Sequence, residues 1–342
     1  MGKFIYISIV PLIFALKFNA FGQGSCANTL YEANKSYEAG DFAKSVTQLT
    51  PCLKSGFNKD QKVEGYRLLT LSYLALNDPA DARKATENML EQNPLYKTSR
   101  LKDPKNFIEL VNSIAVIPKF SLGLAGAAGI NNTYVNVIQQ YNVSNFTKKY
   151  LSKIGNQYGL ALEYNISGKL EVGIDLNTAF KNYSLNYSTN DFNITDNEHL
   201  TFLEVPLYVT YTYGKRRIRP FVRLGAYEDF LLNATSDFSA AYQADKTNYT
   251  DNGVNNKDRR NSTDFGLLGS VGLNLKLDPA WQLFVEFRYT YGLTNIVNVT
   301  NRQADQDLVS NYFYQDDDLK ISNGLFTIGV IRNLNYKVIR QK

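Results

Sequence analysis

Residues 203–213 read LEVPLYVTYTY, and every second side chain in this stretch is aliphatic or aromatic. Leu203, Val205, Leu207, Val209, Tyr211 and Tyr213 alternate with Glu204, Pro206, Tyr208, Thr210 and Thr212. Residues 281–292, WQLFVEFRYTYG, repeat the pattern, with Glu286 and Arg288 on the more polar side. A period of two residues is that of a β-strand whose two faces differ. Both stretches therefore predict strands with one apolar face that ends in aromatic residues and one face that carries charges.

The alternation recurs through the C-terminal two thirds of the chain and predicts eight strands. We expect them at about residues 119–137, 155–166, 169–188, 199–213, 218–236, 263–277, 280–298 and 323–335. Tight connections at 167–168, 214–217 and 277–279 alternate with mostly long, polar ones near 138–154, 189–198, 237–262 and 299–322. An apolar outer face, a polar inner face and turns that alternate with long loops are the pattern of a transmembrane β-barrel.

The positions of the charged residues in the alternating pattern indicate which side of each predicted strand faces lipid and which faces the barrel interior. Aliphatic residues such as Leu160, Leu162, Val222 and Leu224 then face lipid, where an Arg or Lys at the midplane would cost about 2–4 kcal/mol. The interior is predicted to hold a network of paired charges formed by Glu163, Glu171, Asp175, Glu204, Arg223, Asp229, Lys276, Glu286 and Arg288. An eight-stranded barrel is only wide enough for side chains to fill. We therefore interpret the network as structural, with a proton or ion path as the alternative.

Aromatic residues are expected to mark the two edges of the lipid-facing band. Trp281 and Tyr291 share the outward parity and, at about 3.3 Å per residue and about 40° of tilt, lie roughly 25 Å apart. This separation matches the height of the apolar band of such barrels. The predicted aromatic girdles contain Tyr164, Tyr211, Tyr213, Trp281, Tyr289 and Tyr291.

Residues 1–22 have the pattern of a secretory signal peptide. Lys3 supplies a positive start, residues 4–16 form an apolar run, and residues 20–22 fit a small-x-small cleavage site. This run is shorter than the about 20 apolar residues that span a bilayer, and no later stretch reaches that length. We therefore expect a secreted chain without a transmembrane helix, which can still reside in a membrane as a closed barrel.

Residues 26–115 predict paired helices with an internal repeat. Tyr37 and Tyr73 lie 36 residues apart, close to the roughly 34-residue period of tetratricopeptide repeats. Gly40 and Asn77 suit the turn within each helix pair because both tolerate φ > 0. The segment resembles a short tetratricopeptide module, although the tryptophan of that motif is absent. A generic helical hairpin that binds nothing is the alternative interpretation.

Two Asp-Pro pairs predict further helix starts. Asp78-Pro79 and Asp103-Pro104 each place an acid suited to an N-cap before a proline suited to the first helical position. Helices are therefore expected at about residues 79–92 and 104–114.

The two cysteines are predicted to form a disulfide. Cys26 and Cys52 lie on either side of Gly40, so an antiparallel helical hairpin would bring them together at its open end. An oxidising compartment, which the signal peptide implies, favours this pairing over the alternative of two buried free thiols. Lipidation of Cys26 is disfavoured because Gln23 stands where a lipoprotein signal usually has an aliphatic residue.

With these features together, the chain resembles the small outer-membrane β-barrel proteins of Gram-negative bacteria, of the PorT/OmpA-like class, that carry an N-terminal tetratricopeptide-like extension. The implied fold class is α+β multidomain, a short α-helical module followed by an eight-stranded antiparallel transmembrane barrel. The domains are expected at residues 1–22 (signal peptide), 23–117 (periplasmic helical domain) and 118–342 (outer-membrane barrel). The chain departs from such barrels at its end, where a basic tail at 337–342 stands in place of a terminal aromatic residue.

No arrangement of residues predicts catalysis, a cofactor or a metal. The single histidine, His199, is expected at the surface, and the acidic residues Asp305, Asp307 and 316–318 are interpreted as a solvated loop, with calcium binding as the alternative. The densest basic cluster, 257–260, is likewise interpreted as a solvated loop. The net charge of +5 comes without a long basic run, which argues against nucleic acid as a partner.

Two functions fit this organisation. The first is a non-enzymatic anchor or scaffold: outer-membrane lipid holds the barrel, and residues 26–115 dock a periplasmic or membrane protein in envelope biogenesis or secretion. The alternative is a surface-binding or small porin-like transport barrel whose outer loops bind a ligand or whose lumen conducts. An outer-membrane enzyme is a third possibility, for which the sequence offers no cluster of catalytic residues.

Overall fold

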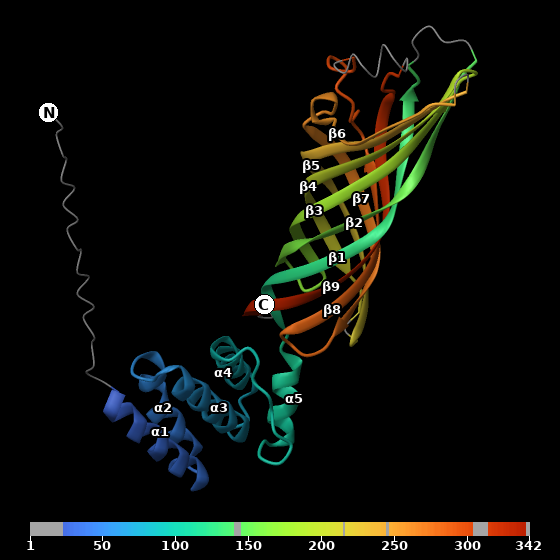
Figure 1. The fold of residues 1–342 in the computed structure, drawn as a ribbon. Coiled ribbons are helices and arrows are strands. Elements are labelled where there is room, and N and C mark those ends of the chain that lie inside the picture. Colours follow the sequence, from blue (N-terminus) through green and yellow to red (C-terminus); the bar gives the residue numbers. More distant parts are fainter. Residues whose placement is uncertain (1–22, 140–144, 215, 244–245, 304–313, 340–342) are drawn as a thin grey trace, which may run out of the picture. The chain divides into compact units, whose positions relative to one another are not determined.

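A computed structural model describes residues 23–139, 145–214, 216–243, 246–303 and 314–339 of the chain. They divide into two compact units. The first is helical and contains the described residues up to Val116 with those from Val338 onward; the second, Ile117–Lys337, is built from β-strands (Figure 1). The predicted signal peptide lies outside the described residues. None of the described helices combines the length and the apolar character that crossing a bilayer requires.

Five helices are described in the first unit. They are α1 (Gln23–Glu38), α2 (Phe42–Lys54), α3 (Lys59–Ala75), α4 (Pro79–Gln92) and α5 (Lys105–Ser113). The turns that join α1 to α2 and α3 to α4 contain Gly40 (φ 81°) and Asn77 (φ 58°), the two residues predicted for these positions. The left-handed conformation explains why glycine and asparagine occupy them. The resemblance to tetratricopeptide repeats stays a prediction.

The disulfide between Cys26 and Cys52 is present and ties α1 to α2, with the two Cα atoms 5.6 Å apart. The alternative of two free thiols is therefore wrong. The disulfide joins residues separated by 26 positions in the sequence. In the chain-entropy description it lowers the conformational entropy of the unfolded chain and so stabilises the folded unit by about 3.5 kcal/mol. Such a contribution matters for a helical unit with a small core, because small units bury little apolar surface.

The two Asp-Pro pairs behave differently. Asp78 caps α4 by accepting a hydrogen bond from the backbone N–H of Asp81 (3.1 Å), as predicted. Asp103 does not cap α5, whose N-cap is Pro104. Its carboxylate instead pairs with the guanidinium of Arg67 on α3 (2.7 Å). This partner is 36 residues away in the sequence, so local spacing could not indicate it.

Eight of the nine described strands form a closed antiparallel ring. They are β1 (Val116–Val137), β2 (Thr147–Asn165), β3 (Leu170–Ser188), β4 (Phe192–Thr212), β5 (Ile218–Tyr242), β7 (Thr263–Lys276), β8 (Trp281–Gly292) and β9 (Asp318–Val338). Neighbours in sequence pair around the ring and β1 pairs with β9, so the barrel closes (Figure 1). The predicted strand count is correct. Closure matters because an open edge would leave unpaired backbone groups in lipid.

The connections fall into two sets at opposite ends of the ring. We call the end with 138–146, 189–191, 243–262 and 293–317 the loop end, and the end with 166–169, 213–217 and 277–280 the turn end. The connection predicted as a loop at 189–198 is only three residues long, because β4 already begins at Phe192. The connection between β5 and β7 contains β6 (Asn248–Asn255), which pairs with β5, and the short helix η1 (Lys257–Arg259).

The wall has the predicted parity along its lipid-facing band. Outward side chains of Leu160, Ile174, Leu224 and Val271 are 43–70% exposed, whereas their polar neighbours on the same strands point inward and are buried. Of the predicted girdle residues, Tyr164, Tyr211, Tyr213 and Trp281 lie outward at the turn end, and Tyr289 and Tyr291 lie outward toward the loop end. Glu228 on β5 is an exposed outward acid and is an exception to the predicted parity of the charged residues.

Beyond this band the alternation reverses. On β4 the outward residues are aliphatic from Leu203 toward the turn end but polar from Thr201 to Asn193, while Ile194 and Leu200 on the inner side are 1% exposed. The reversal falls at the same level on β3, after Phe180, which is the register partner of Thr201. Apolar residues that turn inward indicate water outside the wall. The reversal therefore marks one edge of the lipid-facing band, and the strands continue past it as a water-exposed extension.

Strand length is consistent with this division. β5 has 25 residues, whereas a tilted strand crosses a bilayer with about 9–11. The inner side of the extension holds its own apolar core, in which the loop residues Ile296 and Val297 pack against Tyr183 and Leu200. The extension is thus a filled β-structure and not an open funnel.

Candidate functional site: a filled barrel and an open helical groove

The centre of the barrel contains a network of charged side chains, which we call the central network. It is formed by Glu163, Asp175, Tyr208, Arg223, Glu286 and Arg288. Arg223 of β5 reaches Glu163 of β2 (2.8 Å) and Glu286 of β8 (3.1 Å). Each of these side chains is buried, so the pairing across the lumen replaces the hydration that each charge loses.

A second arginine extends the network toward β3. Arg288 contacts Asp175 (3.1 Å) and Glu286 (2.8 Å). The hydroxyl of Tyr208 donates to Asp175 (2.6 Å), and its ring lies 4.1 Å from the guanidinium carbon of Arg223. Glycine at position 173 makes room for that ring, because a Cβ atom there would stand 2.4 Å from it. The contacts therefore link β2, β3, β4, β5 and β8 across the interior.

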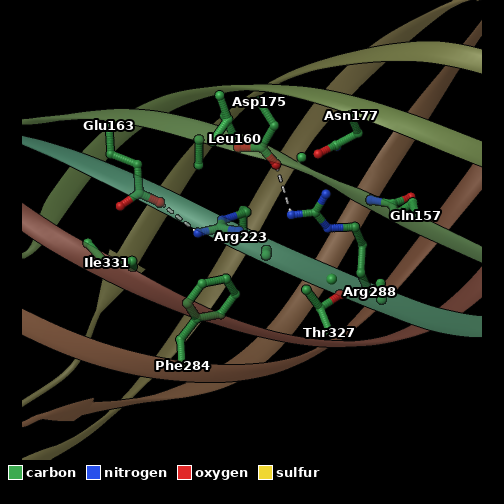
Figure 2. Close-up of a pocket in the computed structure, with 15 residues that line it drawn as sticks. Gln157, Leu160, Glu163, Asp175, Asn177, Arg223, Phe284, Arg288, Thr327 and Ile331 are labelled. Carbon is green, nitrogen blue, oxygen red and sulfur yellow. Dashed lines mark hydrogen bonds and ion pairs between the residues drawn. The ribbon is translucent and has the colours of Figure 1, made fainter.

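Little space remains beside the central network. Figure 2 shows Arg223 directed at Glu163 and Arg288 directed at Asp175, with Phe284 and Thr327 nearby. These residues line a cavity whose volume is about 20 Å³. A buried water needs about 10–15 Å³ of such space. The cavity has room for about one water molecule and is too small for a hydrated ion or a ligand.

A lysine lies between two acids closer to the loop end. Lys181 contacts Glu204 (3.3 Å) and Asp229, and its ammonium group lies 4.9 Å from the centre of the Tyr227 ring. All three charged residues are at most 2% exposed. Lys181 was not among the residues predicted for the network. Its inward parity on β3, opposite to that of Leu176, was the available signal.

Two residues predicted for the network do not join it. Glu171 is half-buried and accepts a hydrogen bond from Asn165 (2.9 Å), and Lys276 is exposed. Neither has an ion pair with a described residue. Both lie within two residues of a strand terminus at the turn end, where the wall stops and side chains of inward parity reach solvent.

Two loops close the barrel at the loop end through a second network, the mouth network of Glu198, Arg259, Arg260 and Asp316. Arg260 pairs with Glu198 of β4 and with Asp316 (3.2 Å), and Arg259 pairs with Asp316 (2.7 Å). All four residues are at most 4% exposed. The interpretation of 257–260 and 316–318 as solvated loops is therefore wrong for Arg259, Arg260, Asp316 and Asp317, which are buried, whereas Lys257 and Asp258 are exposed. The opposite charges of the buried residues neutralise each other inside the barrel.

The start of β2 joins the closure through Lys148. Its ammonium group contacts Asp317 (2.9 Å) and donates to the backbone carbonyls of Gln139 (2.7 Å) and Gln315 (2.9 Å). The described residues contain no group of three or more His, Cys, Asp or Glu side chains that could hold a metal ion. Asp305 and Asp307, the other residues considered for calcium, lie outside the described residues.

The mouth network predicts an acid-sensitive closure. Burial raises the pKa of Asp316, but Arg260 and Arg259 lower it more, so its pKa is below the ordinary 3.8. A lowered folded-state pKa contributes stability that is complete above the unfolded-state value and is lost as the pH falls through the folded-state value. We expect hydrogen exchange at the amides of Arg259 and Arg260 to stay protected at pH 7 and pH 5 and to lose protection well below pH 3.8.

The variant Asp316→Asn tests the same contact at neutral pH. It removes the charge but keeps the shape, so the two amides should lose protection at pH 7. Unchanged protection factors in this variant, or in the natural chain at pH 2, would show that the ion pairs do not hold the mouth closed.

The helical unit contains an open groove between α2, α3 and α4. It has a volume of about 230 Å³, and Leu53, Leu69 and Ala85 lie buried at its base. Tyr66 and Tyr73 line it from α3, and the remaining lining residues are Thr50, Lys54, Asp81, Lys84 and Asn88. The groove, unlike the barrel interior, therefore offers an accessible surface with both apolar and charged groups.

This fold defines a small outer-membrane β-barrel: eight antiparallel strands, an apolar outer band with aromatic edges and a filled polar interior. Residues 118–298, just over half of the chain, match the family model described as outer membrane protein beta-barrel domain. The chain belongs to this family.

The chain is also similar to solved structures of other proteins. Neisserial surface protein A is 14% identical, with a TM-score of 0.33, over 64% of this chain and 99% of that chain. OprG of Pseudomonas aeruginosa is 13% identical, with a TM-score of 0.34, over 64% and 97%. Ail, the attachment invasion locus protein of Yersinia pestis, is 10% identical, with a TM-score of 0.27, over 63% and 99%. These likenesses concern the fold alone. No match is found among curated protein sequences.

Proposed function

We propose that this chain is a closed outer-membrane anchor whose helical unit faces the periplasm and docks a segment of a protein partner in envelope biogenesis or secretion. The observation that carries the proposal is the contrast between the two units: the barrel interior is filled with paired charges, whereas the helical groove is open. The helical unit therefore offers an accessible groove that the interior of the barrel does not.

The orientation follows from the two sets of connections. In barrels of this kind the short turns lie on the periplasmic side and the long loops outside. An even number of strands brings both ends of the barrel segment to the turn end, so the helical unit that precedes β1 would lie in the periplasm. An oxidising periplasm would also favour the Cys26–Cys52 disulfide.

The groove suits an apolar side chain accompanied by a carboxylate. Its base is apolar, and the exposed Lys54 and Lys84 on its rim have no ion pair with a described residue. Burial, followed by Asp81 and Asp78, raises the pKa of Tyr73, so its hydroxyl stays protonated at neutral pH and can donate a hydrogen bond. A peptide segment with an acidic residue beside an aliphatic or aromatic one would use all three features.

Crosslinked co-purification from the native envelope tests the docking role. Tyr73→Ala and Lys84→Glu remove the aromatic wall and reverse the charge of the groove, and we expect at least a tenfold loss of the captured partner. Tyr31→Ala and Lys35→Glu are matched controls, because both residues are exposed on α1 and neither lines the groove. Equal capture by all four variants would refute docking through the groove.

The transport alternative makes an opposite prediction. A conducting lumen requires the central and mouth networks to leave a continuous water path, which a cavity of about 20 Å³ does not supply. Purified protein in planar bilayers is expected to be silent. Steady single-channel steps would favour the porin-like function over the anchor.

A further inference from the structure

A β-bulge interrupts β2 just beyond the lipid-facing band, on the side of the loop end. The register between β2 and β3 shifts between Ser152 and Asn156, so that β2 has one residue more than its partner strand. As a result, the adjacent residues Lys153 and Ile154 are both exposed, and Ile154 is 74% exposed. Bulges redirect side chains in this way and are frequent beside functional sites.

A row of polar contacts crosses the outer face beside the bulge. Asn182 donates to the backbone carbonyl of Ile154 (2.9 Å), and its side-chain oxygen lies 3.2 Å from Nδ1 of His199. Nε2 of His199 lies 3.5 Å from a carboxylate oxygen of Asp237. The row joins β2, β3, β4 and β5 and forms the floor of a shallow surface pocket of about 490 Å³, lined also by Lys153 and Asn197.

The pocket lies at a defined depth relative to the membrane. Asn182 and His199 are register partners, and the next outward pair toward the lipid is Phe180 and Thr201, where the alternation reverses. Phe180 stacks against Tyr158 of β2, with ring centres 5.9 Å apart, on the lipid side of the pocket. Two residues along a strand advance about 6.6 Å, and the headgroup zone on each side of the hydrocarbon is about 5–8 Å thick. The pocket therefore opens into the headgroup zone.

The groups that line the pocket define the chemistry of its occupant. Lys153 has no ion pair with a described residue and offers a cation, and the single acid of the pocket, Asp237, lies beside His199. The amides of Asn182 and Asn197 suit hydroxyl groups, because an amide both donates and accepts hydrogen bonds. Ile154 offers an apolar contact at the same site.

We propose that this pocket binds the phosphorylated sugar headgroup of a glycolipid in the leaflet at the loop end. Lys153 contacts the phosphate, Asn182 and Asn197 contact sugar hydroxyls, and Ile154 contacts the first methylenes of an acyl chain. The proposal depends on the membrane position of the barrel and is independent of docking by the helical unit.

Native mass spectrometry of the full chain, released from mixed micelles, tests this site. The probes are diphosphorylated lipid A, its dephosphorylated form and phosphatidylglycerol, each against a phosphatidylcholine background. We expect the full chain to retain diphosphorylated lipid A at least fivefold more than either other probe. Lys153→Gln should lose this preference, and Lys153→Arg should keep it.

The matched control is Lys257→Gln, which removes an exposed lysine at the loop end outside the pocket. Equal retention of diphosphorylated lipid A by Lys153→Gln and Lys257→Gln would overturn the proposal. Equal retention of phosphatidylglycerol by the natural chain would also overturn it, because a headgroup without a sugar would then suffice. Asn182→Leu is a second variant, and we expect it to weaken lipid A retention while Lys153 is intact.

Discussion

Replacing Arg223 with methionine is expected to lower the stability of the barrel by about 3–5 kcal/mol, the usual cost of leaving buried charges without their partner. Arg223 is the only cation within ion-pair distance of Glu163 among the described residues, and it shares Glu286 with Arg288. Methionine fills a similar volume but leaves a buried carboxylate uncompensated. Urea-induced unfolding in lipid vesicles, followed by the heat-modifiable mobility of the folded barrel on gels, measures the change.

The control for this variant is Arg332→Met on the outer face. Arg332 is exposed and lies 5.4 Å from the centre of the Trp281 ring, a contact worth about 0.5–1 kcal/mol. Adding Glu163→Gln to Arg223→Met should recover part of the loss, because it removes the unpaired charge. If Arg223→Met unfolds at the same urea concentration as Arg332→Met, the central network is not a stabilising feature of the barrel.

The wall of the barrel could be predicted from the sequence because its pattern is local. In lipid, outward residues must be apolar and inward residues can be polar, so a period of two residues specifies both the strands and their faces. The disulfide and the turn at Gly40 are likewise local features of the hairpin of α1 and α2, and the turn at Asn77 is a local feature of the hairpin of α3 and α4. The central network was largely predictable for the same reason, since parity alone directs Glu163, Arg223 and Arg288 inward.

The extension and the mouth network were not predictable in the same way. Between Phe192 and Thr201 the chain still alternates, but the apolar residues have the opposite parity, so a stretch rich in Asn and Thr was interpreted as a loop. Whether the apolar residues of a strand face outward or inward depends on whether lipid or water surrounds the barrel, and the surroundings change from lipid to water at the edge of the membrane. The pairing of Arg260 with Asp316 joins loops separated by 56 residues. Matched clusters of opposite charge in two loops were the only signal.

The accessible polar and charged groups considered for binding lie on two parts of the chain outside the hydrocarbon, the helical unit and the water-exposed extension of the barrel. The charged residues of the central and mouth networks pair with one another, whereas Lys84 in the groove and Lys153 on the extension have no ion pair with a described residue. An unpaired exposed lysine is ordinary on a protein surface. These two lysines differ from others by their positions: Lys84 lies beside an apolar groove, and Lys153 lies at the depth of lipid headgroups.

The position of the hydrocarbon band can be measured directly by placing an arginine on the outer face of β5. Leu224 lies outward near the middle of the band and is 70% exposed, and Leu224→Arg is expected to cost about 2–4 kcal/mol in lipid vesicles. Asn233 lies on the same strand at the level where the alternation reverses, as the register partner of Thr201, and is also exposed.

Asn233→Arg should therefore cost at most about 1 kcal/mol, because near the interface and beyond it an arginine keeps its hydration. Host–guest unfolding of both variants in the same vesicles compares the two depths, since the strand and the introduced residue are the same and both positions are exposed. Equal costs for the two variants would place Asn233 within the hydrocarbon and would move the membrane edge toward the loops. The pocket around His199 would then lie too deep to meet a headgroup, so this comparison also decides whether the site on the extension can exist.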